Sequence, residues 1–323
     1  MKFLIVGLGS MGKRRARLLQ RLRPQAQLLG VDSSADRRAE AAALGLSVWE
    51  SLPQALAEGV QAAFVCTPPA THAPLLEELL QRGVPCFSEL NLVDDGYDRL
   101  QALAEQKAVP LFLSSTMLYR GETRCIRDAV HAYGRPVQYL YHIGQYLPDW
   151  HPWEDYRHFF AGSARTNGCR EIFGIELPWL LQTFGAAEVV SVQHRRLTTL
   201  QIAYPDSWLV QLSHADGSGG VLAVDVASPK AVRRFECFAE GLQLFWEGTP
   251  QTLYRYDPTA AQNVPISVYD AVEHDSRYSD NIVENAYVDE IAEFLQLLEQ
   301  GTPARYSFVA DRQCIALMDA IGV

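Results

Sequence analysis

The sequence predicts an α/β protein of two domains, in which an N-terminal parallel sheet precedes an α+β domain with a mostly antiparallel sheet. Strand-like and helix-like segments alternate up to about residue 120, as in a parallel sheet covered on both faces. Beyond residue 189, apolar and polar residues alternate and short turns such as 216–220 intervene, as in antiparallel sheet. A chain of 323 residues is long enough to bury two cores. We therefore expect one domain at 1–119 and a second at 120–323.

The first domain is expected to contain short apolar strands separated by helices. The predicted strands are Lys2–Val6, Gln27–Val31, Ser47–Trp49, 62–66, 84–88 and 109–113. The predicted helices are one that starts near Met11 and three more at Ala35–Ala43, 70–81 and 94–106. Ligands of such sheets bind beyond the carboxyl ends of the strands, so the residues that follow each strand are candidates for a site.

The second domain is expected to begin with a helix at 122–133 and a strand at 137–147. A helix at 171–184 interrupts the strand-rich half, and helices at 285–298 and 309–321 close the chain.

Three glycines directly follow the first apolar strand and are spaced as Gly7, Gly9 and Gly12. The first allows a tight strand-to-helix turn, the second lets the backbone approach a pyrophosphate, and the third lets the helix pack on the strand. The N-H groups at the start of the helix then face the phosphates, which the helix dipole also favours. The pattern predicts a dinucleotide site.

An acid closes the second predicted strand. Asp32 lies 20 residues after Gly12 and follows an apolar run, where its carboxylate can accept hydrogen bonds from the adenosine ribose hydroxyls. A 2′-phosphate would lie close to this negative charge, which favours NAD over NADP. The nearby Arg37 and Arg38 leave NADP as the less favoured alternative.

Composition excludes several classes of protein. The net charge of −10 argues against a nucleic-acid partner, and no apolar run reaches membrane-spanning length or resembles a signal-peptide core. A basic cluster on the first helix is interpreted as a solvated face; it comprises Lys13, Arg14, Arg15, Arg17, Arg21 and Arg23. The six cysteines are scattered, which predicts reduced side chains, no metal site and a cytoplasmic enzyme.

Several motifs together resemble those of the glucose-fructose oxidoreductase and inositol dehydrogenase family (Gfo/Idh/MocA). They are the run Gly7-Leu8-Gly9-Ser10-Met11-Gly12, the run Cys66-Thr67-Pro68-Pro69 with His72, Glu89, and the sheet-rich second half. The resemblance covers essentially the whole chain. It implies a Rossmann domain, an open and mostly antiparallel second sheet, NAD(P) bound between the domains, and redox chemistry at a hydroxyl of a sugar, cyclitol or nucleotide sugar. Residues 144–157 are similar to members from bacterial surface-glycan pathways.

The resemblance also implies roles for individual residues. Gly7, Gly9, Met11 and Gly12 would hold the pyrophosphate, and Asp32 the adenosine ribose. Thr67 and Pro68 would line the nicotinamide half, His72 would support their loop, and Glu89 would approach the nicotinamide ribose. Four neighbours complete the candidate cofactor site: Ser10, Ser33, Arg37 and Cys66. The alternative is structural, because prolines end strands and a histidine in a first helical turn is often a cap.

The sequence departs from the family pattern where proton transfer is expected. The usual Glu-Lys-Pro reads Glu89-Leu90-Asn91, and the positions of an Asp and a catalytic His align with Ile172 and Ile175. Aliphatic side chains cannot relay a proton, whereas oxidation of an alcohol requires a group that takes the hydroxyl proton.

Four residues are candidates to replace the missing groups. Glu176 shares a helix face with apolar residues and could be a base with a raised pKa. Arg170 would suit a carboxylate or phosphate of the substrate, His151 lies in an aromatic-rich segment, and Glu89 follows a strand. Each has a structural alternative, and Arg170 and Glu171 in particular could be surface or interface charges.

We therefore expect an NAD-dependent oxidoreductase that acts on a sugar-like small molecule, with no metal and with neither nucleic acid nor membrane as partner. Two alternatives remain: an enzyme that uses bound NAD transiently during elimination or epimerisation, and a non-catalytic NAD-binding regulatory protein. The resemblance further implies a homodimer or homotetramer formed through the second sheet, because an open sheet leaves an apolar face uncovered.

Overall fold

The computed structural model describes residues 1–152, 154–275 and 281–323, so Trp153 of the 144–157 stretch lies outside the described residues. The chain forms two compact units. The first contains Met1–Ser115 and Tyr287–Arg312, and the second contains Thr116–Ala286 and Gln313–Val323.

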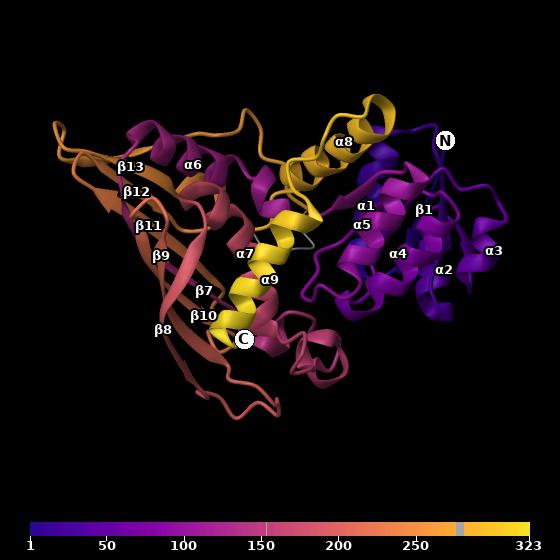
Figure 1. Ribbon diagram of the computed structural model, residues 1–323, viewed down its shortest axis with the longest axis horizontal. Helices are drawn as coiled ribbons and strands as arrows, with labels where there is room; N and C mark the ends of the chain where they lie inside the picture. The colour runs from indigo at the N-terminus through magenta and orange to yellow at the C-terminus, as the bar shows by residue number, and fades with distance from the viewer. Residues whose placement is uncertain (153, 276–280) are drawn as a thin grey trace. The chain divides into compact units, whose positions relative to one another are not determined.

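The first unit is built on a parallel sheet of six strands in the order β3-β2-β1-β4-β5-β6. Strand β1 of this sheet is labelled in Figure 1. The strands are β1 (Lys2–Val6), β2 (Gln27–Val31), β3 (Ser47–Trp49), β4 (Ala62–Val65), β5 (Cys86–Ser88) and β6 (Leu111–Leu113). The helices that alternate with them are α1 (Ser10–Leu22), α2 (Ala35–Ala43), α3 (Leu52–Leu56), α4 (His72–Gln81) and α5 (Tyr97–Lys107). All neighbouring strands run in the same direction, and β1 lies between β2 and β4 with Phe3 opposite Leu28 and Ala62. The predicted doubly wound α/β architecture is confirmed.

A helix from the C-terminal part of the chain completes the core of the first unit. In α8 (Glu284–Gln300), the ring of Phe294 packs on Phe64, Phe87 and Phe112, with centroids 5.2 to 5.5 Å apart. The units therefore differ from the linear division at residue 119. Periodicity revealed this helix, but nothing in its sequence indicates which sheet its apolar face covers.

The second unit is built on an eight-stranded sheet in the order β14-β13-β12-β11-β7-β10-β9-β8. Its strands are β7 (Gln138–Gly144), β8 (Ala187–Arg195), β9 (Ser207–His214), β10 (Gly219–Asp225), β11 (Val232–Ala239), β12 (Leu242–Trp246), β13 (Leu253–Asp257) and β14 (Gln262–Pro265). Every neighbouring pair is antiparallel except β7 and β10, which confirms the expected mostly antiparallel sheet.

Two helices of the second unit, α6 (Gly121–Tyr133) and α7 (Gly168–Phe184), contact strands of this sheet, and α9 (Phe308–Ile321) closes the chain. Helix α7 begins three residues earlier than expected because the side chain of Asn167 caps it, accepting a hydrogen bond from the Arg170 N-H at 2.8 Å.

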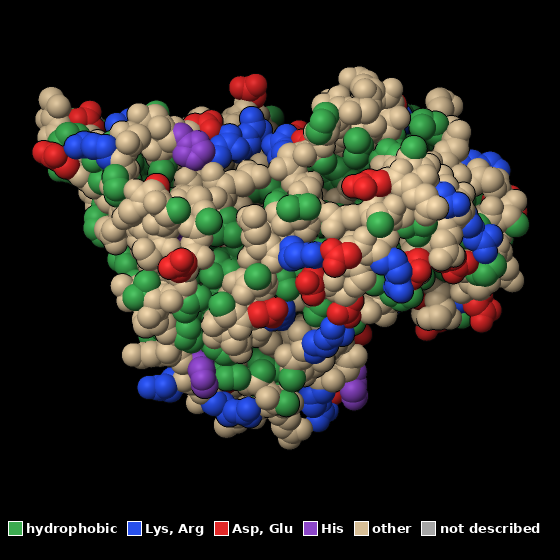
Figure 2. All heavy atoms as spheres, viewed as in Figure 1, with side chains coloured by type: hydrophobic (Ala, Val, Ile, Leu, Met, Phe, Trp, Pro, Cys, Tyr) green, Lys and Arg blue, Asp and Glu red, His purple; other side chains and the backbone are tan. Residues whose placement is uncertain are grey.

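The other face of this sheet carries exposed apolar side chains. Burial alternates along β9 and β10, and Leu140, Leu209, Val221 and Phe238 are each 39 to 49% exposed. The strand register places Val221 directly opposite Leu140. Figure 2 shows hydrophobic side chains gathered over the strands of this unit.

The described part of the chain contains neither a membrane-spanning helix nor a cluster of metal-binding side chains. None of its helices is long and apolar enough to cross a bilayer, and none of its His, Cys, Asp and Glu side chains form a group suited to a metal ion.

Candidate functional site

The glycine turn of the first unit has the geometry that a diphosphate requires. Gly7 has φ of +92°, and a Cβ there would lie 2.8 Å from the Cys66 carbonyl oxygen. At Gly12 a Cβ would lie 1.9 Å from the Gly7 carbonyl oxygen, so the helix start packs directly on the turn. At Gly9, in contrast, a Cβ would meet no described atom within 4 Å. The turn is tightly built on the inside and open on the side of Gly9.

No side chain of the described residues caps the start of α1. Gly9 is the N-cap and offers no side-chain hydrogen bond, and the first turn, which includes Ser10 and Met11, contains no acidic residue. The first N-H groups of a helix have no intrahelical acceptor and carry its positive dipole end. These residues fit the pyrophosphate of a dinucleotide.

Asp32 is ordered by backbone amides of the turn beside it. Its Oδ2 accepts a hydrogen bond from the Leu8 N-H at 2.8 Å, and its Oδ1 accepts one from the Ser34 N-H at 2.9 Å. The Arg37 guanidinium lies 4.0 Å from Oδ2, and its side chain is 48% exposed. Arg38 donates to the carbonyl oxygen of Ser33 at 2.9 Å. Asp32 thus connects the glycine turn to the end of β2 and stands where the sequence places the ribose contact.

The segment after β4 packs against the glycine turn and is fixed by His72. A Cβ on Gly7 would come within 2.9 Å of the Thr67 side chain. The Thr71 hydroxyl donates to the carbonyl oxygen of Pro68 at 2.7 Å. His72 is 2% exposed, with Nε2 2.7 Å from the Thr67 carbonyl oxygen and Nδ1 2.6 Å from Asn91 Oδ1. Burial lowers the pKa of His72, so the ring is a neutral bridge between two loops.

A buried ionic cluster joins α1, β5 and α8. Arg15 donates to Glu89 Oε1 and Oε2 at 2.6 and 3.2 Å, and to Glu290 Oε2 at 2.6 Å. Glu290 also accepts from Ser114, and burial raises its pKa. Both carboxylate oxygens of Glu89 are therefore engaged by one guanidinium.

The cluster corrects the interpretation of the basic residues on α1 as a solvated face. Arg15 has no exposed surface and Arg14 is 3% exposed, with the Arg14 guanidinium 4.6 Å from the centre of the Tyr287 ring. The helix presents these two arginines to Glu290 and Tyr287 of α8, which is why they are buried.

The second unit contains a pocket of about 150 Å³ beside α7. Its lining residues come from β7 and the segment after it, α7, the start of β11 and residue 281, and they are Ile143, Gly144, Gln145, Trp150, Glu171, Ile172, Ile175, Glu176, Ala231, Val232, Arg233 and Asn281. One aromatic ring, two amides and three ionisable groups thus share an otherwise apolar wall. Ile172 and Ile175, the positions at which the family pattern breaks, are both in it.

Glu176 lines this pocket, but protein donors occupy both of its oxygens. Oε2 accepts from the Tyr141 hydroxyl at 2.6 Å and from Trp179 Nε1 at 2.8 Å. Oε1 accepts from Arg233 Nε at 3.0 Å and Nη2 at 2.6 Å. Glu176 is completely buried. Its assignment as a base stays a prediction, and its surroundings favour a structural ion pair.

Glu171 is the residue of this pocket that sequence reasoning left aside. Its Oε2 is buried and has no hydrogen-bond partner among the described residues, although the residue as a whole is partly exposed. Burial raises the pKa of the Glu171 carboxyl to about 8. Its position beside Ile172 and Ile175 on the helix was the available signal, but sequence alone does not show that its carboxyl is desolvated.

The other two catalytic candidates do not line the pocket. Arg170 is 6% exposed and donates to the carbonyl oxygen of Val323 and, at 2.7 Å, to Asp319, so it anchors the end of α9. His151 Nδ1 lies 3.5 Å from Glu154, and its ring stacks on Phe159 with centroids 4.8 Å apart. Both residues are placed to support neighbouring segments of the second unit.

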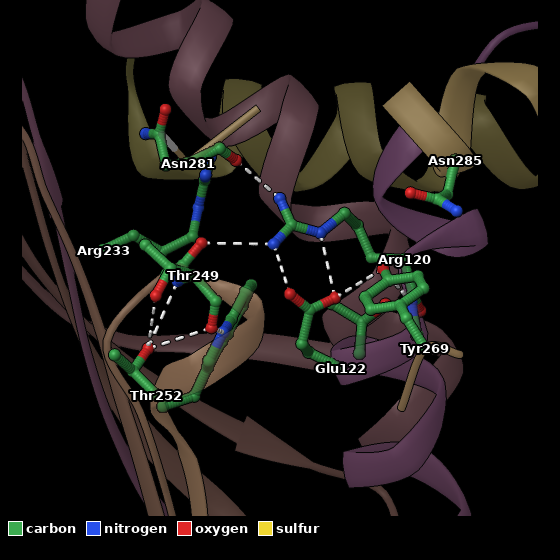
Figure 3. A network of polar contacts seen from close by, with 12 residues as sticks. Arg120, Glu122, Arg233, Thr249, Thr252, Tyr269, Asn281 and Asn285 are labelled. Carbon is green, nitrogen blue, oxygen red and sulfur yellow. Dashed lines mark hydrogen bonds and ion pairs between the residues drawn. The ribbon is translucent and has the colours of Figure 1, made fainter. Parts of the chain in front are cut away.

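A second buried network holds the segment that brings Asn281 to the pocket (Figure 3). Arg120 pairs with Glu122 and donates to the carbonyl oxygens of Asn281 at 2.6 Å and Gly248 at 3.1 Å. The Tyr269 hydroxyl donates to Glu122 Oε2 at 2.8 Å. Arg120, directly before α6, thereby holds the backbone at Asn281, which lines the pocket, and at Gly248.

Comparisons with known proteins agree with the sheet topology and the glycine turn. Residues 1–115 match the GFO_IDH_MocA family model, described as an oxidoreductase family with an NAD-binding Rossmann fold. No curated protein matches the chain significantly.

Solved structures of low sequence identity share the fold along almost the whole chain. GenD2 from gentamicin A biosynthesis, solved with NAD, is 19% identical with a TM-score of 0.77, over 99% of this chain and 92% of its own. UDP-N-acetylglucosamine 3-dehydrogenase GnnA from Acidithiobacillus ferrooxidans is 20% identical with a TM-score of 0.75, over 99% and 96%. The WlbA dehydrogenase from Bordetella pertussis, solved with NADH and UDP-GlcNAcA, is 18% identical with a TM-score of 0.75, over 100% and 94%.

The family model covers the segment that contains the glycine turn, Asp32, the His72 loop and Glu89. The first 115 residues are thus similar to the Gfo/Idh/MocA oxidoreductase family, whose model describes an NAD-binding Rossmann fold.

Proposed function

We propose that this protein is a dehydrogenase that transfers hydride between NAD and a hydroxyl or carbonyl of a sugar or nucleotide sugar. The observation that carries the proposal is the turn at Gly7–Gly12, which is closed by backbone contacts yet open beside Gly9. NAD, when bound, would accept or supply the hydride. Gly7, Gly9 and the first turn of α1 would hold its diphosphate, and Asp32 its adenosine ribose.

The pocket of the second unit supports a carbohydrate-like substrate. Trp150 supplies an aromatic surface, Gln145 and Asn281 supply amides, and Glu171 supplies a carboxyl group. Such a mixture of an apolar wall and a few polar groups is typical of small-molecule sites. The similar structures include a UDP-N-acetylglucosamine 3-dehydrogenase and a dehydrogenase solved with NADH and UDP-GlcNAcA, which makes this substrate class the first to test.

Cofactor binding and turnover are tested separately. Titration of the purified protein with NADH, followed by nicotinamide fluorescence, should show saturation below millimolar concentration, and absence of binding would contradict the proposal. Incubation with NAD⁺ and a panel of sugars and UDP-sugars should then produce NADH absorbance for at least one compound. Binding of NADH without turnover of any compound would contradict the dehydrogenase assignment and favour a regulatory NAD-binding protein.

We also propose that two copies associate through the exposed face of the eight-stranded sheet. Leu140, Leu209, Val221 and Phe238 give this face an apolar character that is unusual for surface in contact with water. Light scattering of the wild-type protein should give at least twice the mass of one chain. Val221→Lys should yield monomers, whereas Val309→Lys, which alters an exposed valine of α9, should not. A wild-type monomer would refute this assembly. The cytoplasmic location expected from the scattered cysteines stays a prediction.

A further inference from the structure

The pocket of the second unit contains three ionisable side chains, and two of them neutralise each other. Glu176 and Arg233 form a buried ion pair in which two guanidinium nitrogens contact one carboxylate oxygen. Tyr141 and Trp179 occupy the remaining oxygen of Glu176. Protein donors therefore engage both oxygens of Glu176, and the donors to Oε1 are charged.

The third ionisable group, Glu171, has a carboxylate oxygen that no donor of the described residues contacts. It lies in the first turn of α7, and its main-chain N-H is bonded to the Asn167 carbonyl oxygen at 2.9 Å, so the backbone beneath it is fixed. Its Oε2 is buried without a hydrogen-bond partner among the described residues. Buried polar atoms of native proteins are nearly always paired, so an exception in a pocket indicates a place for a ligand atom.

We propose that Glu171 is the catalytic acid-base residue of the dehydrogenase. The inference rests on the proposed function and adds the group that the sequence lacks at Ile172 and Ile175. During oxidation, the O-H bond of the bound alcohol breaks and its proton moves to a carboxylate oxygen of Glu171. The C-H bond breaks at the same time, and its hydrogen leaves with both bonding electrons as hydride to NAD⁺. The electron pair of the former O-H bond then forms the second bond of C=O. In reduction, protonated Glu171 returns the proton to the carbonyl oxygen.

The pKa of Glu171 allows it to accept a proton during oxidation and to donate one during reduction near neutral pH. Burial holds its pKa at about 8, so both protonation states are populated near neutrality, which is the condition for efficient proton transfer. The charged or titratable groups nearby are Glu176 and Arg233 in the pocket wall, and Tyr204. Burial raises the pKa of Tyr204, and Glu171 raises it further to a smaller degree. Burial is the cause of the raised pKa of Glu171, and the neighbouring Glu176–Arg233 pair is internally neutral.

The experiment compares Glu171→Gln with the wild-type protein on a substrate found in the UDP-sugar panel. Glutamine keeps the shape of the side chain but cannot exchange a proton. We expect kcat for oxidation to fall about 100-fold or more, as for loss of a general base. The Kd for NADH should stay within twofold, because the nucleotide residues are unchanged. Glu240→Gln, at an exposed position, is the matched control and should retain wild-type kcat.

The pH profile separates catalysis from a structural role. For the wild-type protein, kcat/KM for oxidation should rise tenfold per pH unit below about 8 and then level off. Glu171→Gln should lack this limb while unfolding at a similar temperature. If the variant keeps both the rate and the limb, the inference is wrong although the dehydrogenase assignment survives. If only KM rises, Glu171 binds a substrate group, such as an ammonium, and the inference is again wrong.

A measurement without substrate tests the same residue. Infrared difference spectra of wild-type protein and Glu171→Gln should contain a protonated carboxyl band that titrates near pH 8. A midpoint near the ordinary value for glutamate would overturn the inference even in an active enzyme. If the wild-type protein binds NADH but oxidises none of the panel, the proposed function fails first, and the catalytic role of Glu171 fails with it.

Discussion

Two glycines of the nucleotide turn should differ in how alanine substitution affects the stability of the fold. Gly12→Ala places a methyl group 1.9 Å from the Gly7 carbonyl oxygen, where about 3 Å is the closest approach that real Cβ atoms show. Helix α1 must therefore move by roughly 1 Å away from the turn. Overpacking of this kind costs about 3 kcal/mol, more than the ~1 kcal/mol that alanine gains over glycine within a helix.

Gly9→Ala should leave the fold almost unchanged but damage the site. The added methyl group meets no described atom within 4 Å, and Gly9 has φ of −70°, which alanine adopts readily. The free energy of unfolding should stay within about 1 kcal/mol of wild type. The methyl group would, however, occupy the space through which a diphosphate approaches the backbone, so NADH affinity should fall at least tenfold, about 1.4 kcal/mol.

Urea denaturation and NADH fluorescence titration of the two variants form the assay. Gly12→Ala should lose stability and binding together, and Gly9→Ala should lose binding alone. Wild-type NADH affinity in Gly9→Ala would show that the diphosphate does not lie over this turn, and wild-type stability in Gly12→Ala would contradict the packing argument.

Three further outcomes follow from the buried charges of the first unit. Arg15→Met leaves two buried carboxylates without their cation, so it should lower the free energy of unfolding by about 3 to 5 kcal/mol in urea titrations. Arg21→Met, on the exposed side of the same helix, is the control and should change the free energy of unfolding by less than about 0.5 kcal/mol. Burial raises the pKa of Asp311 from 3.8 to about 6, so between these values the folded state holds a proton that the unfolded state releases. The free energy of unfolding should therefore fall by about 2 kcal/mol as pH rises from 4 to 6. Asp311→Asn should flatten this pH dependence in denaturation curves, and equal slopes in both proteins would contradict the reasoning. Asp32→Ala should weaken NADH binding more than NADPH binding in fluorescence titrations, because the carboxylate disfavours a 2′-phosphate; an unchanged ratio of the two affinities would remove this residue from the ribose site.

Local patterns in the sequence were sufficient for most of the fold. The alternation of apolar runs and helical periodicity located the strands of the first sheet and indicated that the second sheet is mostly antiparallel. The spacing of Gly7, Gly9 and Gly12 located the nucleotide turn. Both signals depend on neighbours in the chain. The same reasoning missed α3, a helix of five residues that is too short to show periodicity.

The features that sequence could not supply depend on contacts between distant segments. Arg15 looks solvated until Glu290, 275 residues away, is found beside it. Glu176 looked like a base because helical spacing placed it beside apolar residues, but the donors from Tyr141 and Arg233 come from two other strands. Glu171 could be recognised only when the burial of its carboxyl was known.

The contribution of α8 to the first unit has a consequence for synthesis on the ribosome. The nucleotide-binding half emerges first, yet Phe64, Phe87 and Phe112 lack the covering ring of Phe294 until nearly all of the polypeptide has been translated. A fragment ending at residue 115 would display these rings to water and would invite aggregation or chaperone capture. The stretch that matches the family model is thus shorter than the compact unit it belongs to, which also contains Tyr287–Arg312.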